Sequence, residues 1–234
     1  MAATNGFPRS VHDLEQEFAA LASEIPDSPE KRAISVLHGI VMELWRNSDG
    51  DHGAGDGFPD VAELYRSAPP MEAPALNEPL PPGTRAPDFA LRDPSGEVVQ
   101  LSDFSGRPLV LVFYPLDWSP GCSQQLDLYQ QELDEFRSRG AEVVAISVDS
   151  LYSHGAWAAV RGITFPLLAD FHPKGAVARD YSVWREPDGF SERALYVIEP
   201  NGMIAYSHVA PFVHHVPDIY ELLQVLDELA GAKV

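Results

Sequence analysis

An alternation of short apolar runs with stretches of helical spacing constrains this fold most. Residues 109–114, Leu-Val-Leu-Val-Phe-Tyr, have the length and the β-branched and aromatic composition of a buried strand. After them, Leu126, Tyr129 and Leu133 recur at the spacing of one helical face. Strands that alternate with helices in this way are typical of an α/β sheet with helices packed on both faces.

The alternation continues to the end of the chain. We expect strands near residues 109–114, 142–148, 166–169, 193–198 and 203–207. We expect helices near residues 122–138, 152–161, 173–180 and 217–230. A turn signal at residues 93–96, Asp-Pro-Ser-Gly, predicts a β-hairpin that precedes them.

Cys122 is the only cysteine of the 234 residues. One cysteine excludes an intrachain disulfide, and it excludes a cysteine-rich zinc or iron–sulfur site within one chain. Cys122 falls where the loop after the strand at 109–114 enters the first turn of the next helix. Free N–H groups and the helix dipole favour an anion there, so this position favours the thiolate, the nucleophilic form of a thiol.

The net charge and the hydropathy of the chain argue against some classes of partner. The net charge of −19 argues against long-range attraction to nucleic acid or to an anionic membrane. The most apolar helical stretch, residues 33–45, is interrupted by His38, Gly39 and Glu43, and is too short and too polar to span a bilayer. The first residues lack a basic start that leads into an apolar run, so we expect no signal peptide and a cytosolic protein.

The chain divides into two parts and a linker. Residues 1–67 are predicted to form a helical N-terminal extension, with helix starts at Ser10 and at Ser28-Pro29. Residues 68–82 are rich in proline and predict an extended, semi-rigid linker. Residues 83–234 carry the strand and helix alternation. The extension is interpreted either as an added layer on the fold or as a docking or oligomerisation element.

Pro115, Ser119 and Cys122 fit the pattern Pro-x-x-x-Thr/Ser-x-x-Cys. This resembles the active-site signature of the peroxiredoxins, the alkyl hydroperoxide reductase and thiol-specific antioxidant family of thiol peroxidases. The run 165–177 is similar to the one-cysteine alkyl hydroperoxide reductase E group. Arg193 falls where the family keeps its active-site arginine.

The resemblance covers roughly residues 80–230. It implies a thioredoxin-like fold, with a central mixed β-sheet flanked by helices, and a redox-active cysteine that reduces hydrogen peroxide or organic hydroperoxides as an antioxidant enzyme. It also implies a homodimer that pairs through loops around the active site. We expect no metal and no organic cofactor.

The resemblance assigns the catalytic roles. Cys122 would attack a peroxide oxygen as thiolate and become a sulfenic acid. Arg193 would stabilise the thiolate and polarise the O–O bond. The Ser119 hydroxyl would donate to the peroxide or to the thiolate, although it is equally suited to cap the helix. Pro115 would close the pocket over the sulfur.

Three further residues are candidates for substrate binding. The backbone N–H of Gly121 would complete the set of donors. Trp118 would shape a pocket for an organic peroxide, with a core aromatic as the equal alternative. Gln125 stands where many relatives have a glutamate that orients the arginine, and it would orient Arg193 without charge assistance.

The sequence also indicates how the sulfenic acid is reduced. Asp127 stands where one subgroup of the family has a resolving cysteine. The reductant is therefore expected to be an external thiol, either a small molecule or a thioredoxin- or glutaredoxin-like protein.

Other interpretations remain open at this point. A peroxide-sensing relay would oxidise Cys122 and signal through the N-terminal helices, and a scaffold would keep the fold without the chemistry. His208, His214 and His215 are interpreted as surface histidines rather than metal ligands, because adjacent side chains on an extended segment point to opposite faces. The acidic glycine-rich residues 47–57 are interpreted as a solvated loop, because they lack the terminal acid of a calcium loop.

Overall fold

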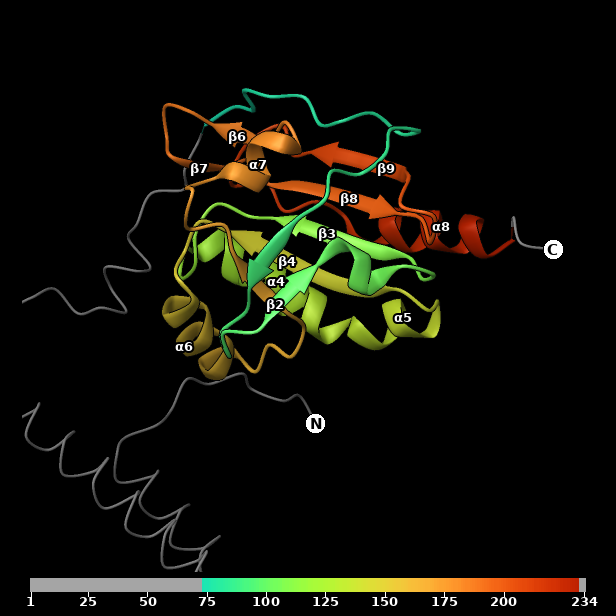
Figure 1. The fold of residues 1–234 in the computed structure, drawn as a ribbon, viewed down its shortest axis with the longest axis horizontal. Coiled ribbons are helices and arrows are strands. Elements are labelled where there is room, and N and C mark those ends of the chain that lie inside the picture. The colour runs from blue at the N-terminus through green and yellow to red at the C-terminus, as the bar shows by residue number, and fades with distance from the viewer. Residues whose placement is uncertain (1–72, 232–234) are drawn as a thin grey trace, which may run out of the picture. The chain divides into compact units, whose positions relative to one another are not determined.

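The structure is a computed structural model that describes residues 73–231. Its centre is a seven-stranded sheet of order β2-β1-β5-β4-β3-β8-β9 (Figure 1). The central strand β3 (Leu109–Phe113) pairs in parallel with β4 (Glu142–Ser147) and antiparallel with β8 (Ala194–Ile198). Every residue of β3 is buried. This mixed sheet confirms the predicted α/β class.

The outer strands complete the sheet on either side. β5 (Leu167–Ala169) lies parallel to β4, and β9 (Ile204–Val209) lies antiparallel to β8. β1 (Ala90–Arg92) and β2 (Val98–Gln100) form an antiparallel hairpin in which Arg92 is opposite Val98. The hairpin predicted around residues 93–96 is therefore confirmed.

Side chains of β3 alternate between two apolar layers. Val110 and Val112 pack with α4 (Pro120–Gln131), α5 (Leu133–Ser138), α6 (Leu151–Arg161) and α8 (Ile219–Gly231). Leu111 and Phe113 pack on the other face with α7 (Ala176–Asp180) and with the hairpin of β6 (Trp184–Arg185) and β7 (Phe190–Ser191). Successive side chains of a strand point to opposite faces of the sheet, so β3 contributes side chains to both apolar layers.

Several predicted boundaries are wrong in detail. The helix expected at 122–138 begins at Pro120 and is divided at Glu132 into α4 and α5. The helix expected at 173–180 begins only at Ala176, because Gly175 has a φ of 69°, which an α-helix does not accept. The β6–β7 hairpin and a 3₁₀-helix at Leu101–Phe104 were not anticipated, because such short elements lack a readable period.

The predictions for residues 1–67 and for the acidic loop at 47–57 lie outside the described residues, as does the first part of the linker predicted at 68–82. The remainder of that linker, from residue 73, lies along the domain and makes hydrogen bonds to it. In residues 73–231 no helix combines the length and the apolar character that crossing a membrane requires.

Candidate active site

Cys122 lies in the first turn of α4, just beyond the carboxyl end of β3. Its side chain is 0% exposed. Pro120 is the first residue of the helix and has no N–H, and the N–H of Ser123 donates to the carbonyl of Ser119 at 2.9 Å. The N–H groups of Gly121 and Cys122 therefore stand where a helix leaves its donors without helical partners. The expected position of the thiol is confirmed.

Arg193 reaches Cys122 from a distant part of the chain. It directly precedes β8, and the antiparallel register places Ala194 opposite Phe113, the last residue of β3. This pairing sets the beginning of β8 beside the loop that enters α4. Arg193 Nη2 lies 3.4 Å from Cys122 Sγ and donates to it, although 71 positions separate the two residues. The structure thus brings together the predicted cysteine and the predicted arginine.

Two oxygen atoms hold the guanidinium in this place. Arg193 Nε donates to the carbonyl of Val213 at 2.8 Å, and Nη1 donates to Gln125 Oε1. Gln125 Nε2 in turn donates to Tyr129 Oη at 3.3 Å. A Cβ atom at Gly121 would lie 3.0 Å from Arg193 Nη2, so glycine permits the close approach of the arginine. The positioning role expected of Gln125 stays a prediction.

The charge of Arg193 has no carboxylate beside it among the described residues. Its side chain is 2% exposed, and none of the ion pairs found within residues 73–231 includes it. A buried cation with neutral partners is costly until an anion approaches it. The Cys122 sulfur is in contact with that cation.

Ser119 departs from its expected hydrogen bonding. It occupies the N-cap position of α4 by its backbone, but its side chain caps no N–H of the helix. Its hydroxyl donates to the carbonyl of Leu116 at 3.0 Å. Because the single hydroxyl proton is used there, the lone pairs of Oγ are left to accept from a hydroperoxide O–H. Pro115, two residues beyond the end of β3, is buried, and its role in closing the pocket stays a prediction.

Trp118 lies against α6 in this structure. Its backbone is left-handed, with a φ of 63°, and its Nε1 donates to Ser153 Oγ at 3.1 Å. The ring lies 6.5 Å from that of Trp157, and the side chain is 44% exposed. A role for Trp118 in shaping an organic-peroxide pocket stays a prediction.

The sequence did not predict a buried polar network between the segment after β3 and α6. Tyr114 Oη donates to Asp117 Oδ1 at 2.8 Å, and His154 Nδ1 lies 2.9 Å from Asp117 Oδ2. The N–H of Asp117 donates to Asp149 Oδ2 at 2.8 Å. Burial raises the pKa of the Tyr114 hydroxyl well above its usual range, so it remains a donor. The available signal was that Asp117 and Asp149 follow the carboxyl ends of neighbouring parallel strands.

Residues 73–231 contain no cluster of three or more His, Cys, Asp or Glu side chains arranged to hold a metal ion.

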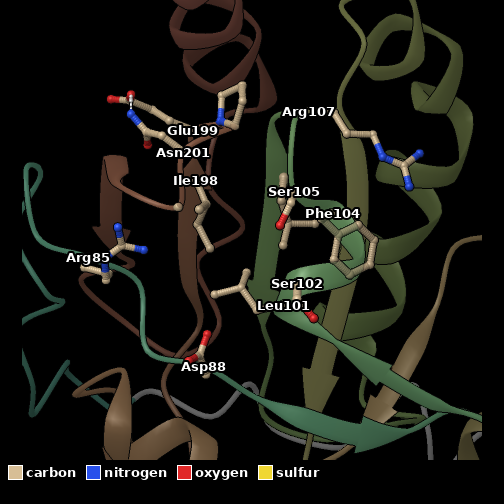
Figure 2. A pocket seen from close by; sticks show the side chains of 13 residues that line it. Arg85, Asp88, Leu101, Ser102, Phe104, Ser105, Arg107, Ile198, Glu199 and Asn201 are labelled. Atoms are coloured by element: carbon tan, nitrogen blue, oxygen red, sulfur yellow. Dashed lines mark hydrogen bonds between the residues drawn. The ribbon is translucent and has the colours of Figure 1, made fainter.

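The pocket in Figure 2 is lined by Leu109, Ile198 and their neighbours, including Arg85 and Arg107. Leu109 and Ile198 are paired at the opposite end of β3 and β8 from Phe113 and Ala194, so this pocket is distant from Cys122 along the sheet.

Comparisons with known proteins agree with this geometry. Residues 82–207 match the model of the AhpC/TSA family. The chain belongs to this family. It is thus a peroxiredoxin, and its single cysteine fits the one-cysteine type of thiol-dependent peroxidase.

Two curated relatives illustrate the similarity. Alkyl hydroperoxide reductase E of Mycobacterium tuberculosis is 38% identical over 54% of this chain and 84% of the relative. A chloroplastic peroxiredoxin Q of Sedum lineare is 33% identical over 72% of this chain and 91% of the relative.

Solved structures support the thioredoxin-like fold. The reduced 2-Cys peroxiredoxin of Plasmodium vivax aligns with a TM-score of 0.59 and 28% identity over 66% of this chain and 84% of that chain. Peroxidoxin BcpB of Mycobacterium tuberculosis aligns with a TM-score of 0.56 and 27% identity over 64% of this chain and 96% of that chain. The expected fold of the C-terminal part is confirmed.

Proposed function

We propose that Cys122 reduces hydrogen peroxide or organic hydroperoxides in a one-cysteine cycle. The observation that carries the proposal is the contact of Arg193 Nη2 with Cys122 Sγ at 3.4 Å, in a site where the described partners of the arginine are neutral. The thiolate attacks the terminal oxygen of the hydroperoxide, an S–O bond forms and the O–O bond breaks. The sulfur becomes a sulfenic acid, and the alkoxide or hydroxide takes a proton and leaves as alcohol or water.

Each group around Cys122 has its own role in the attack on the peroxide. Arg193 turns from stabilising the thiolate to stabilising the negative charge that develops on the leaving oxygen. The N–H groups of Gly121 and Cys122 add donors at the helix terminus. Ser119 Oγ accepts from the peroxide O–H and so aligns the O–O bond with the sulfur. Pro115 excludes water from the reacting atoms.

An external thiol completes the cycle in this proposal. Asp127 accepts from Arg161 Nε at 2.9 Å and from its Nη2 at 2.6 Å, so an ion pair occupies the place of a resolving cysteine. The sulfenic acid and a thiol form a mixed disulfide and release water. A second thiol then displaces Cys122 as a thiol and forms the external disulfide. We propose a small thiol or a thioredoxin- or glutaredoxin-like protein as donor, in the cytosol, where such pools are kept reduced.

Access to the sulfur limits both halves of the cycle. Cys122 is fully buried, so the residues over it have to move before a peroxide or a thiol can reach its sulfur. A thiol is the bulkier reactant, so its entry requires the first turn of α4 to open. That turn lacks a side-chain cap, which lowers the cost of opening. The same burial opposes a disulfide between two Cys122 residues of a dimer.

A homodimer fits the exposed aromatic residues around the site. Trp118, Tyr152 and Phe171 are exposed and follow the carboxyl ends of β3, β4 and β5, which are neighbouring parallel strands. Exposed aromatic side chains gathered at one edge of a sheet favour an interface. Sedimentation velocity of the full chain tests this, and a Trp118→Glu, Tyr152→Glu variant is expected to sediment as the monomer. A wild-type monomer at high concentration would contradict the proposal.

Stopped-flow tryptophan fluorescence tests the peroxidase reaction directly. The reduced protein is mixed with a slight excess of hydrogen peroxide, and mass spectrometry then identifies the product. A rapid signal with one oxygen added at Cys122, absent in Cys122→Ser, is expected. The same experiment with cumene hydroperoxide tests organic substrates. Oxidation by both peroxides no faster than that of free cysteine would refute the proposed function.

A further inference from the structure

Residues 73–80 form a strap that crosses the domain beside the segment after β9. The N–H of Val213 donates to the carbonyl of Ala73 at 2.9 Å, and the N–H of Ala75 donates to the carbonyl of Pro211 at 3.0 Å. Figure 1 shows this strap as the blue-green trace that runs past β6 and β9 before the chain turns into β1. The strap is therefore paired with the chain rather than simply leading into it.

Glu192 fastens the middle of the strap. Its Oε1 accepts from the N–H of Leu76 at 2.7 Å, from the N–H of Asn77 at 3.2 Å and from Asn77 Nδ2 at 3.1 Å. The same amide nitrogen donates to the carbonyl of Trp184 at 2.9 Å. Glu192 is buried, and its other oxygen accepts from Arg185 Nη1 at 2.8 Å. Its Oε1 thus has these hydrogen-bond donors only when the strap is in place.

Both attachments lead to the active-site arginine. Glu192 directly precedes Arg193, so the strap holds the backbone from which the catalytic guanidinium extends. Val213, whose N–H is held by Ala73, offers its carbonyl to Arg193 Nε at 2.8 Å. Two separate hydrogen-bond routes therefore run from the strap to the group that contacts Cys122.

We propose that Asn77 and Glu192 are positioning residues for Arg193, and that the docked strap sets the rate at which Cys122 reacts with peroxide. The inference rests on the proposed function, because the rate concerned is that of the peroxidase step. A freed guanidinium regains rotamer entropy and leaves the sulfur without its cation. The family pattern at residues 115–122 does not include Asn77 or the strap, because the strap lies in the linker before the peroxiredoxin domain.

The test uses the full chain with Asn77→Asp. The new carboxylate faces the carbonyl of Trp184 and the carboxylate of Glu192. None of these groups can donate a hydrogen bond, so they repel one another and the strap leaves its place on the domain. We expect the second-order rate constant of Cys122 with hydrogen peroxide to fall by about tenfold or more. Asn201→Asp is the matched control, because it makes the same change on an exposed side chain beside the pocket of Figure 2, which is distant from Cys122. Its rate constant is expected to equal that of the wild type.

A double-mutant cycle separates positioning from general loosening of the fold. In an Arg193→Met background, Asn77→Asp is expected to reduce the residual rate no further, since the arginine through which it acts is gone. Near-UV circular dichroism checks that each variant is folded. If Asn77→Asp does not fold, Asn77→Ala replaces it with an expected loss of about threefold, because only the two side-chain hydrogen bonds are removed.

Each outcome decides between the two proposals. A wild-type rate no faster than that of free cysteine defeats the proposed function itself. A fast wild type with an equally fast Asn77→Asp defeats only the strap. Equal losses from Asn77→Asp with and without Arg193 also overturn the strap inference, because the effect would then not pass through the arginine.

Discussion

Two buried arginines, eight positions apart, have opposite surroundings. Arg185 and Arg193 are each 2% exposed. Arg185 donates to Glu192 at 2.8 Å and to Asp188 at 2.6 Å, so two carboxylates balance its charge. Among the described residues Arg193 meets only neutral oxygens and the Cys122 sulfur. The comparison teaches that burial alone does not identify a functional arginine, whereas a buried and uncompensated charge indicates one that awaits an anion.

The difference predicts that one arginine serves stability and the other serves chemistry. A cation paired inside the protein costs much to remove, because its partner is left buried and charged. A cation without a carboxylate partner costs less to remove, because no buried carboxylate is stranded. Substitution of Arg185 should therefore act mainly on unfolding, and substitution of Arg193 mainly on peroxide reduction. Arg185 also donates to Glu192 and to the carbonyl of Pro74 in the strap, so a smaller loss of rate is expected at that position as well.

The largest expected effect is on stability, in Arg185→Met. Removing this side chain leaves the Glu192 carboxylate buried without its cation, so the free energy of unfolding should fall by about 3–5 kcal/mol. Urea unfolding followed by circular dichroism measures it. A loss below about 1 kcal/mol would show that the Arg185 pair is dispensable and would break the comparison.

Arg193→Met is expected to affect activity instead. Loss of the donor to the sulfur and to the leaving oxygen should lower the peroxide rate constant by about 10²–10³-fold. The free energy of unfolding should change far less than in Arg185→Met. Stopped-flow oxidation and urea unfolding of the same preparation check both halves, and a rate within threefold of wild type would remove Arg193 from the mechanism.

Asp170 extends the comparison to a buried acid. Its carboxylate accepts from the backbone N–H groups of Val177 at 3.2 Å and Ala178 at 2.9 Å. Burial raises the pKa of Asp170 from 3.8 to about 6. The folded protein therefore holds this proton more tightly than the unfolded chain, so the contribution to stability is complete below pH 4 and is lost as the pH rises to 6.

Asp170→Asn isolates this contribution. Relative to wild type, the variant should gain about 3 kcal/mol between pH 4 and pH 7, because the asparagine does not ionise. Urea unfolding across this pH range, with wild type in parallel, gives the difference. A difference that is constant with pH would show that Asp170 does not titrate between these limits.

Gly121→Ala should have the smallest effect on the peroxide rate constant, and it tests how closely Arg193 must approach Cys122. The added Cβ would lie 3.0 Å from Arg193 Nη2, and the guanidinium is held by Val213 and Gln125, so it has to give up contacts to move. A rate loss of about threefold to tenfold is expected. Gln124→Ala, an exposed change in the same helix, is the control and should react at the wild-type rate.

Much of the fold was accessible from local pattern. The strand at 109–114, the hairpin at 93–96 and the place of Cys122 in a first helical turn follow from periodicity and turn chemistry within a few residues. The division of the predicted helix at Glu132 and the late start of α7 after Gly175 were missed, because the period of apolar residues does not report where the backbone leaves helical geometry. The direction of the Ser119 hydroxyl was also out of reach, because it depends on the carbonyl of Leu116.

By itself, the sequence determined the alternation of elements, the motif that holds the thiol and the absence of a second cysteine. Only the tertiary structure decided which charge that thiol meets. The register of β3 with β8 brings Arg193 to Cys122, and Val213 and the strap then hold the arginine there. The physical reason is range: periodicity and helix termini act between near neighbours, whereas charge compensation depends on segments that pack together only in the folded chain.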